Sequence, residues 1–124
     1  MWNSLDRSHE LDHERLDAYT AAVELDGAVV AIARKAGRGH GWLSDQATRA
    51  SASVVLNLAE ALGREGLDRA RALRIARGSA LEVDAALTLL LPRGACRAEE
   101  RSVAKALTVR VVAMLTALRN RASP

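Results

Sequence analysis

The sequence is poor in aromatic residues and in prolines. Only 2% of its 124 residues are aromatic, and phenylalanine is absent. This composition argues against a β-sandwich or β-barrel, whose cores usually need more aromatic and β-branched residues. The two prolines are Pro92 and Pro124, so helices can extend over most of the chain. The hydrophobic content of 49% is sufficient for the core of one domain.

A second cysteine, a long apolar run and a signal-like segment are also missing. Cys96 stands alone, which excludes an internal disulfide and favours a reducing compartment. No apolar run approaches the roughly 20 residues of a membrane span. The first residues, MWNSLDRSHELDHE, contain no hydrophobic signal core. We therefore expect a cytoplasmic protein that makes no contact with a membrane.

The charges are distributed unevenly between the two halves of the chain. Residues 1–63 hold six Arg and Lys against nine Asp and Glu, whereas residues 64–124 hold twelve against six. A basic second half is compatible with an anionic partner such as nucleic acid. Ordinary exposed arginines explain the same pattern, because 16 of the 18 cations are arginine.

Periodicity and turn residues predict an all-α protein. We expect a flexible lead-in over residues 1–13 and one bundle domain over 14–121. The glycines of residues 37–41 and 63–66 and the Pro-Gly segment after residue 91 separate four helices of similar length. An up-down-up-down antiparallel four-helix bundle is the simplest arrangement. The expected helices are 14–36, 44–62 (or from residue 41), 67–91 and 98–121.

Apolar residues recur at steps of three and four in each expected helix, which lines them along one face. In the first helix they form two neighbouring rows, and we expect both to be buried. The rows of the first helix are Ala18, Ala22, Leu25, Val29, Ile32 and Leu16, Tyr19, Val23, Val30. The rows of the other helices are Ala47, Ala50, Val54, Leu58, Ala61; Leu73, Ala76, Ala80, Val83, Leu87, Leu90; and Val103, Leu107, Val111, Met114, Leu118.

Polar residues in the second helix follow the same spacing and border the apolar row. They indicate either a hydrogen-bonded seam inside the fold or a contact surface. A second polar cluster lies in the third helix, and antiparallel packing would bring Glu60 near Arg74, Arg49 near Glu82 and Asn57 near Ser79. Such pairing would offset the cost of burying these groups. The predicted seam comprises Gln46, Arg49, Ser53, Asn57, Glu60, Arg74, Ser79 and Glu82.

Groups suited to catalysis or metal binding are sparse. His9 and His13 are four residues apart, but no carboxylate or cysteine is fixed beside them. Glu60 and Glu82 are not followed three residues later by histidine, as the ligands of a di-iron bundle would be. No Gly-x-Gly-x-x-Gly or P-loop pattern occurs. We expect a protein without enzymatic activity, cofactor or metal.

The polar residues resemble the motif of a small four-helix-bundle family, typified by the intervening-sequence proteins of the 23S ribosomal RNA gene. Members usually show Leu-x-x-Gln-x-x-Arg-x-x-x-Ser-x-x-x-Asn-x-x-Glu-Gly followed by Ile-Ala-x-Gly-Ser-x-x-Glu. Ala61 replaces the glycine that normally follows the first Glu. The matching residues here are Leu43, Gln46, Arg49, Ser53, Asn57, Glu60, Ile75, Ala76, Gly78, Ser79 and Glu82.

The family includes accessory proteins of diversity-generating retroelements, which form homopentameric rings, bind nucleic acid and associate with a reverse transcriptase. The resemblance implies a homo-oligomer, a pentamer by this likeness, that contacts RNA, DNA or a reverse transcriptase through a basic surface. A protein–protein interaction module whose arginines serve solubility is the alternative. The candidate nucleic-acid contacts are Arg64, Arg69, Arg71, Arg97, Arg101, Lys105 and Arg110.

Overall fold

The computed structural model describes residues 7–122, and every regular element in that range is a helix. Helix α1 begins at Arg7, well before the start expected near Glu14, so the second half of the predicted lead-in is helical. The side chains of His9 and His13 lie outside the described part of the chain. The other boundaries fall close to the predicted ones. The helices are α1 (Arg7–Lys35), α2 (Gly41–Leu62), α3 (Gly66–Leu90) and α4 (Ala98–Ala122).

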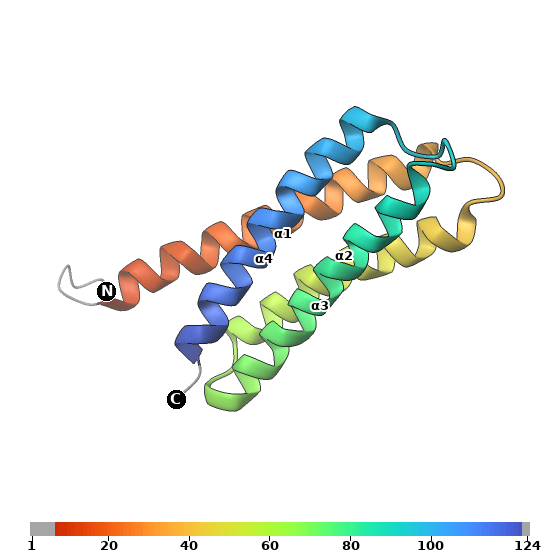
Figure 1. The fold of residues 1–124 in the computed structure, drawn as a ribbon. Coiled ribbons are helices and arrows are strands. Elements are labelled where there is room, and N and C mark those ends of the chain that lie inside the picture. The colour runs from red at the N-terminus through yellow and green to blue at the C-terminus, as the bar shows by residue number, and fades with distance from the viewer. Residues whose placement is uncertain (1–6, 123–124) are drawn as a thin grey trace.

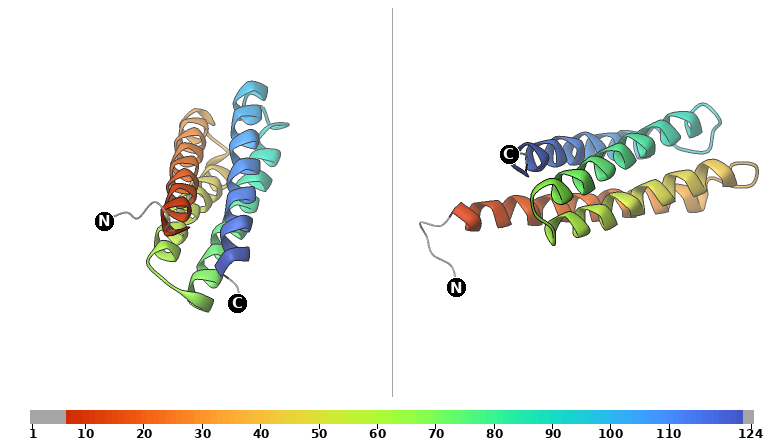
Figure 2. Two further views of the ribbon diagram at one scale, coloured as in Figure 1. Left: turned by 90° about the vertical axis from the view of Figure 1, so that its left-hand side faces the viewer. Right: turned by 90° about the horizontal axis from the view of Figure 1, so that it is seen from below.

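The four helices form the predicted up-down-up-down bundle. Each helix packs against the next, and α4 returns to pack against α1 (Figure 1). The α3 and α4 helices form one layer, and α1 and α2 form the other. The N-terminal part of α1 extends beyond the end of the bundle where α2 turns into α3 (Figure 2). Both described ends of the chain therefore lie at the end that carries the α2–α3 turn.

Turns between the helices depend on glycines at positive φ. Gly37 and Gly39 have φ of 81° and 90° between α1 and α2, and Gly94 has φ of 72° before α4. These values lie in the left-handed region that glycine adopts at low cost. Because α2 begins at Gly41, Ser44 lies inside the helix and does not cap it; its hydroxyl is buried without a hydrogen-bond partner.

Small residues dominate the buried core. The first predicted row of α1 and the predicted rows of α2 and α3 are all buried, which confirms these three faces. Alanines make up much of the core, so the backbones can approach closely and each contact depends on few atoms. The Ser51 hydroxyl, fully buried on α2, donates to Asp26 of α1 at 2.7 Å.

Two predicted apolar rows are wrong in part. On α1, Leu16, Tyr19 and Val23 are exposed, because α1 packs only against α2 and α4 and these residues lie on its outer side. On α4, Val103 is 57% exposed, and the buried row is rotated by about one residue. Thr108 can occupy that row because its hydroxyl donates to the Ala104 carbonyl at 2.8 Å. The buried row of α4 is Ala104, Thr108, Val111, Leu115 and Leu118.

Candidate nucleic-acid interface

A polar seam joins α2 to α3. The hydroxyls of Ser53 and Ser79 share a hydrogen bond of 2.8 Å between the two helices. The Asn57 amide donates to the Ser53 carbonyl and hydroxyl at 2.9 and 3.0 Å. Nearer the start of α2, the Gln46 amide donates to Glu82 at 3.2 Å. The serine and asparagine contacts satisfy half-buried polar groups. Together with the exposed Gln46–Glu82 contact they fix the register of the two helices.

The individual pairs of the seam differ from the predicted ones by about one helical turn. Ser53 faces Ser79 in place of Asn57, and Gln46 faces Glu82 in place of Arg49. Glu60 pairs at 3.3 Å with Arg64, in the turn that follows α2, and not with Arg74. The sequence spacing shows which residues share a face, but the register between helices depends on how the turn and core pack.

Two exposed members of the predicted seam take no part in it. Arg49 and Arg74 are exposed and, within the described residues, form no hydrogen bond or ion pair. Gly78 does not mediate a close backbone approach either, because a Cβ added there would meet nothing within 4 Å. The seam is therefore narrower than predicted, and the exposed arginines are free to contact another molecule.

A basic face lies on the opposite side of α3, where two rows of side chains flank the groove between α3 and α4. We call it the α3–α4 basic face. Its residues follow helical steps of three and four, apart from one step of two turns between Lys105 and Val112 on α4. Five are cations and one, Asp84, is a carboxylate. The rows are Arg74, Arg77, Leu81, Asp84, Thr88 on α3 and Arg101, Lys105, Val112, Thr116, Arg119 on α4.

Asp84 holds the upper part of this face. One oxygen accepts a hydrogen bond from Arg101 and the other from Lys105, both at 2.9 Å. Arg101 also donates to the Thr88 hydroxyl at 2.8 Å. The Arg101 side chain is only 14% exposed, whereas that of Lys105 is 49% exposed. One carboxylate thus orders two cations and neutralises only one of them.

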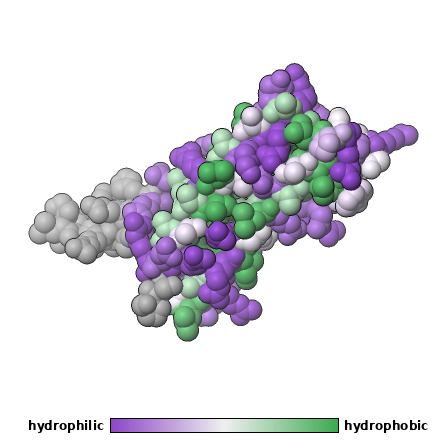
Figure 3. Space-filling view, in the orientation of Figure 1, coloured by the Kyte–Doolittle hydropathy of each residue, from purple (hydrophilic) through white to green (hydrophobic). Residues whose placement is uncertain are grey.

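The lower part of the face lacks a carboxylate from either row. The Arg77 guanidinium donates to the Thr116 hydroxyl at 3.2 Å, which sets the register of the antiparallel pair. One turn beyond this contact, Arg74 of α3 and Arg119 of α4 occupy corresponding positions. Figure 3 shows this face of the molecule, with hydrophilic residues on both sides of a central hydrophobic strip. The two rows therefore place five cations and one carboxylate along the contact between α3 and α4.

The structure brings only two of the predicted contact residues, Arg101 and Lys105, onto this face. Arg97, another predicted contact, pairs with Glu99 at 3.7 Å and lies outside the rows. Arg110 is exposed on α4 but lies outside the row. The spacing from Arg74 to Asp84 and from Arg101 to Arg119 is the sequence signal for this second face of each helix. The apolar rows and the family motif lie on other faces and do not indicate it.

The remaining predicted contacts cluster near the α2–α3 turn. Arg64 pairs with Glu60, and Arg71 lines a hollow beside that pair. Arg69 donates to the Ala61 carbonyl at 2.9 Å and so caps the end of α2. Partial burial, followed by the nearby charge of Arg15, lowers the pKa of Arg69. We assign Arg69 a role in closing the bundle end, because its guanidinium is engaged by the backbone.

The described residues offer few groups for chemistry. No cluster of three or more His, Cys, Asp or Glu side chains that could hold a metal occurs among them. Cys96 is buried, and burial, followed by the negative charge of Glu100, raises the pKa of its thiol. Among the described helices, none has the length and apolar character needed to cross a membrane.

Comparison with known families gives one match. The family model described as 23S rRNA-intervening sequence protein matches residues 14–117, which is most of the chain and extends from within α1 to within α4. No curated protein matches the chain. The matched range contains both the polar seam and most of the α3–α4 basic face.

Proposed function

The chain belongs to the 23S rRNA-intervening sequence protein family, and we propose that it is a non-enzymatic protein that binds nucleic acid, alone or within a nucleoprotein, through the α3–α4 basic face. The observation that supports this proposal is the pair of facing rows, which carry five cations and a single carboxylate. Phosphate binding needs cations that are accessible and not already paired. Arg74 meets both conditions, and Lys105 shares its carboxylate with Arg101.

The dimensions of the face suit a polyanion. From Arg74 to Thr88 the α3 row is about 21 Å long at 1.5 Å per residue. A nucleic acid strand rises about 3.4 Å per nucleotide, so the row can follow roughly six phosphates. The hydroxyls of Thr88 and Thr116 lie in the same rows and donate to backbone carbonyls of their own helices. Their oxygens accept from Arg101 and Arg77, so they position these two cations along the face.

Fluorescence anisotropy with a labelled RNA or DNA oligonucleotide, titrated at several salt concentrations, tests the proposal. We expect log affinity to fall with log salt with a slope of about −2 to −4, for three to five phosphate contacts. The double variant Arg74→Glu/Arg77→Glu should lose binding by at least about tenfold and reduce the slope.

The matched control is Arg93→Glu/Arg97→Glu, which reverses the same number of charges at the other end of α3 and outside the rows. Circular dichroism verifies that both variants are folded. The proposal fails if the wild-type protein does not bind at low salt, or if the control variant loses as much affinity as the α3 variant.

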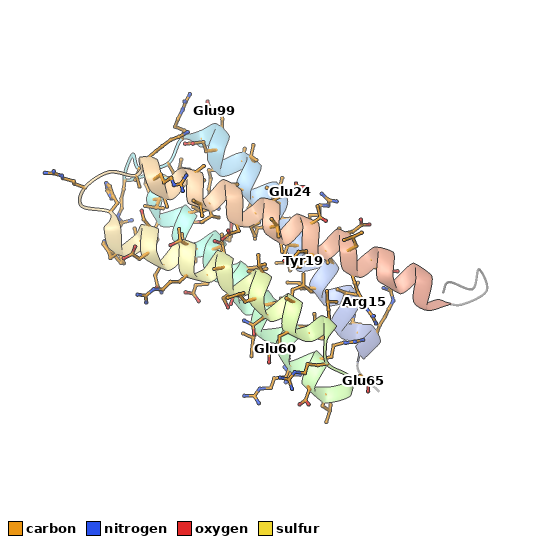
Figure 4. All side chains as sticks on the ribbon, turned by 180° about the vertical axis from the view of Figure 1, so that it is seen from behind. Arg15, Tyr19, Glu24, Glu60, Glu65 and Glu99 are labelled. Carbon is orange, nitrogen blue, oxygen red and sulfur yellow. The ribbon has the colours of Figure 1, made fainter. Side chains whose placement is uncertain are left out.

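A protein partner is the second candidate, supported by the exposed apolar row of α1. Leu16, Tyr19 and Val23 are 61%, 37% and 45% exposed and lie on one side of the helix. Figure 4 shows the side of the bundle formed by α1 and α2, with Tyr19 labelled on α1. An exposed apolar row on a surface helix is typical of a protein contact. Its partner is a second copy of this chain in a homo-oligomer, a pentamer by family likeness, or a reverse transcriptase.

Light scattering at several protein concentrations tests this candidate. The contact lies on α1 if the assembly dissociates in the double variant Leu16→Ser/Val23→Ser. The control is Leu81→Ser/Leu89→Ser on α3, which should leave the assembly intact. A monomer at all concentrations excludes the homo-oligomer and leaves only a different protein as the partner.

A further inference from the structure

A hollow of about 360 Å³ lies on the outer side of the α2–α3 pair, close to the turn between them. Figure 4 shows Glu60, one of its lining residues, near that turn, together with Glu65 in the turn itself. The volume lies within the range of small-molecule sites, which begins at about 300 Å³. The lining residues are Asn57, Glu60, Arg64, Asp68, Arg71, Ala72 and Ile75.

Three residues supply hydrogen-bond acceptors to the polar lining. Both hydrogens of the Asn57 amide nitrogen are directed to Ser53, so the amide oxygen is left as an acceptor. One Glu60 oxygen is engaged by Arg64 at 3.3 Å, and the other is not. The Asp68 carboxylate adds two more acceptors. These oxygens can therefore accept from hydrogen-bond donors of a ligand.

Next to these acceptors are two guanidinium groups and an apolar wall. Arg64 lies beside Glu60, so a donor and an acceptor are adjacent. Ile75 is 46% exposed and, with Ala72, supplies apolar surface for the flat face of a ring. Arg71 is exposed at the rim.

Three arginines connect the hollow to the α3–α4 basic face. Arg71, Arg74 and Arg77 are three residues apart, and each step of three turns the side chain by about 60° around the helix. Arg71 lines the hollow, Arg77 contacts Thr116 in the groove, and Arg74 lies exposed between them. A single strand bound along the groove can thus pass over Arg74 and reach the hollow with its phosphates on cations throughout.

We propose that the hollow binds an unpaired guanine base of a nucleic acid strand whose backbone lies on the α3–α4 basic face; this rests on the function proposed above. The Watson–Crick edge of guanine carries two adjacent donors, N1–H and the N2 amine, beside the O6 acceptor. Glu60 accepts from the two donors, and Arg64 donates to O6. Adenine and cytosine present one amine beside an acceptor, and uracil presents one N–H between two acceptors, so none of them offers a carboxylate two donors. Base edges of single-stranded nucleic acids are read in this way.

Binding of single-stranded 12-mers that contain one variable base in an otherwise uniform sequence tests the inference. The variable base is guanine, adenine or inosine, which lacks the N2 amine. We expect guanine to bind about tenfold more tightly than adenine, with inosine between them. Glu60→Gln should remove the guanine preference, while Arg71→Ala should weaken binding of all three strands by a similar factor.

Glu99→Gln is the matched control, because it removes one carboxylate charge from an exposed glutamate outside both surfaces. Equal binding of the guanine, adenine and inosine strands overturns the guanine site and leaves the proposed function standing. Loss of binding to every strand in the wild-type protein overturns the proposed function itself. If Glu60→Gln keeps the base preference but abolishes self-association, the hollow holds a side chain of a neighbouring protein and the inference is wrong.

Discussion

Ser53 of α2 and Ser79 of α3 share a hydrogen bond of 2.8 Å, and both residues belong to the motif that the sequence carries for its family. Asn57 joins them by donating to the Ser53 hydroxyl and carbonyl. The motif residues at the centre of α2 and α3 are therefore positioned to hold two helices in register. This gives the central part of the motif a structural role and leaves its outer residues, Arg49 and Glu60, available for contact.

The seam can be tested by a double-mutant cycle on Ser53 and Ser79. Ser53→Ala leaves the Ser79 hydroxyl without its partner and removes one of the two acceptors of the Asn57 amide, so we expect a loss of about 1–2 kcal/mol in the free energy of unfolding. The double variant should cost less than the sum of the single variants, with a coupling of at least about 0.5 kcal/mol. Urea unfolding measures these values, and Ser102→Ala, at an exposed position on α4, is the control. Additive effects would contradict a direct pair.

The role of Asp84 gives opposite expectations for stability and for binding. Asp84→Asn removes the charge that orders Arg101 and Lys105, so we expect unfolding to become easier by about 1–2 kcal/mol. The same change removes the carboxylate of the basic face, so nucleic acid should bind more tightly and with a steeper salt dependence. Asp45→Asn, at an exposed position on α2, should change neither. A purely structural Asp84 would lower stability and leave the affinity unaltered.

The ion pair between Lys35 of α1 and Glu100 of α4 predicts a dependence of stability on pH. The hydrogen bond from Lys35, followed by that from the Arg97 backbone, lowers the pKa of Glu100 below its usual value near 4.5. A carboxyl whose pKa is lower in the folded state stabilises the fold at pH values above its unfolded-state pKa. This contribution is lost as the pH falls through the folded-state pKa.

Lys35→Gln should therefore destabilise the protein at neutral pH, and its difference from the wild type should shrink in acid. Urea unfolding between pH 7 and about pH 3 measures this change. Arg34→Gln alters a neighbouring cation and should show a constant difference over the same range. A difference for Lys35→Gln that does not depend on pH would show that the pair does not set the acid response.

The fold could be predicted from the sequence because local signals agree. Glycines at the turns and apolar residues at helical spacing define the same four segments, and rows such as Leu73 to Leu90 are buried as expected. The errors arise where the local signal is ambiguous. Val103 and Leu107 resemble a core row more than Ala104 and Thr108 do, yet a closely packed alanine core favours the smaller residues.

The basic face could be predicted only in part. The positive charge of the second half pointed to α3 and α4, and Arg101 and Lys105, two of the predicted contacts, lie on the basic face. Which cations are available depends on partners distant in sequence, such as Asp84, which lies 17 and 21 residues from the two cations it holds. Sequence spacing can show that Arg77 and Arg119 share a face with the other cations, but it cannot show which cations are already paired.

Cys96 provides a final test of the packing at the end of the bundle that carries the turn before α4. It is 7% exposed, and burial raises the pKa of its thiol above the usual value near 9.0, so little thiolate is present at pH 8. We expect iodoacetamide to alkylate the folded protein at least about tenfold more slowly than free cysteine. After unfolding in urea, the protein should react at a rate similar to that of free cysteine. Mass spectrometry follows the reaction. Slow alkylation of the folded protein with rapid alkylation in urea locates the protection in the packing around Cys96. Rapid alkylation of the folded protein would mean that this end of the bundle opens and exposes the thiolate, which is the nucleophile.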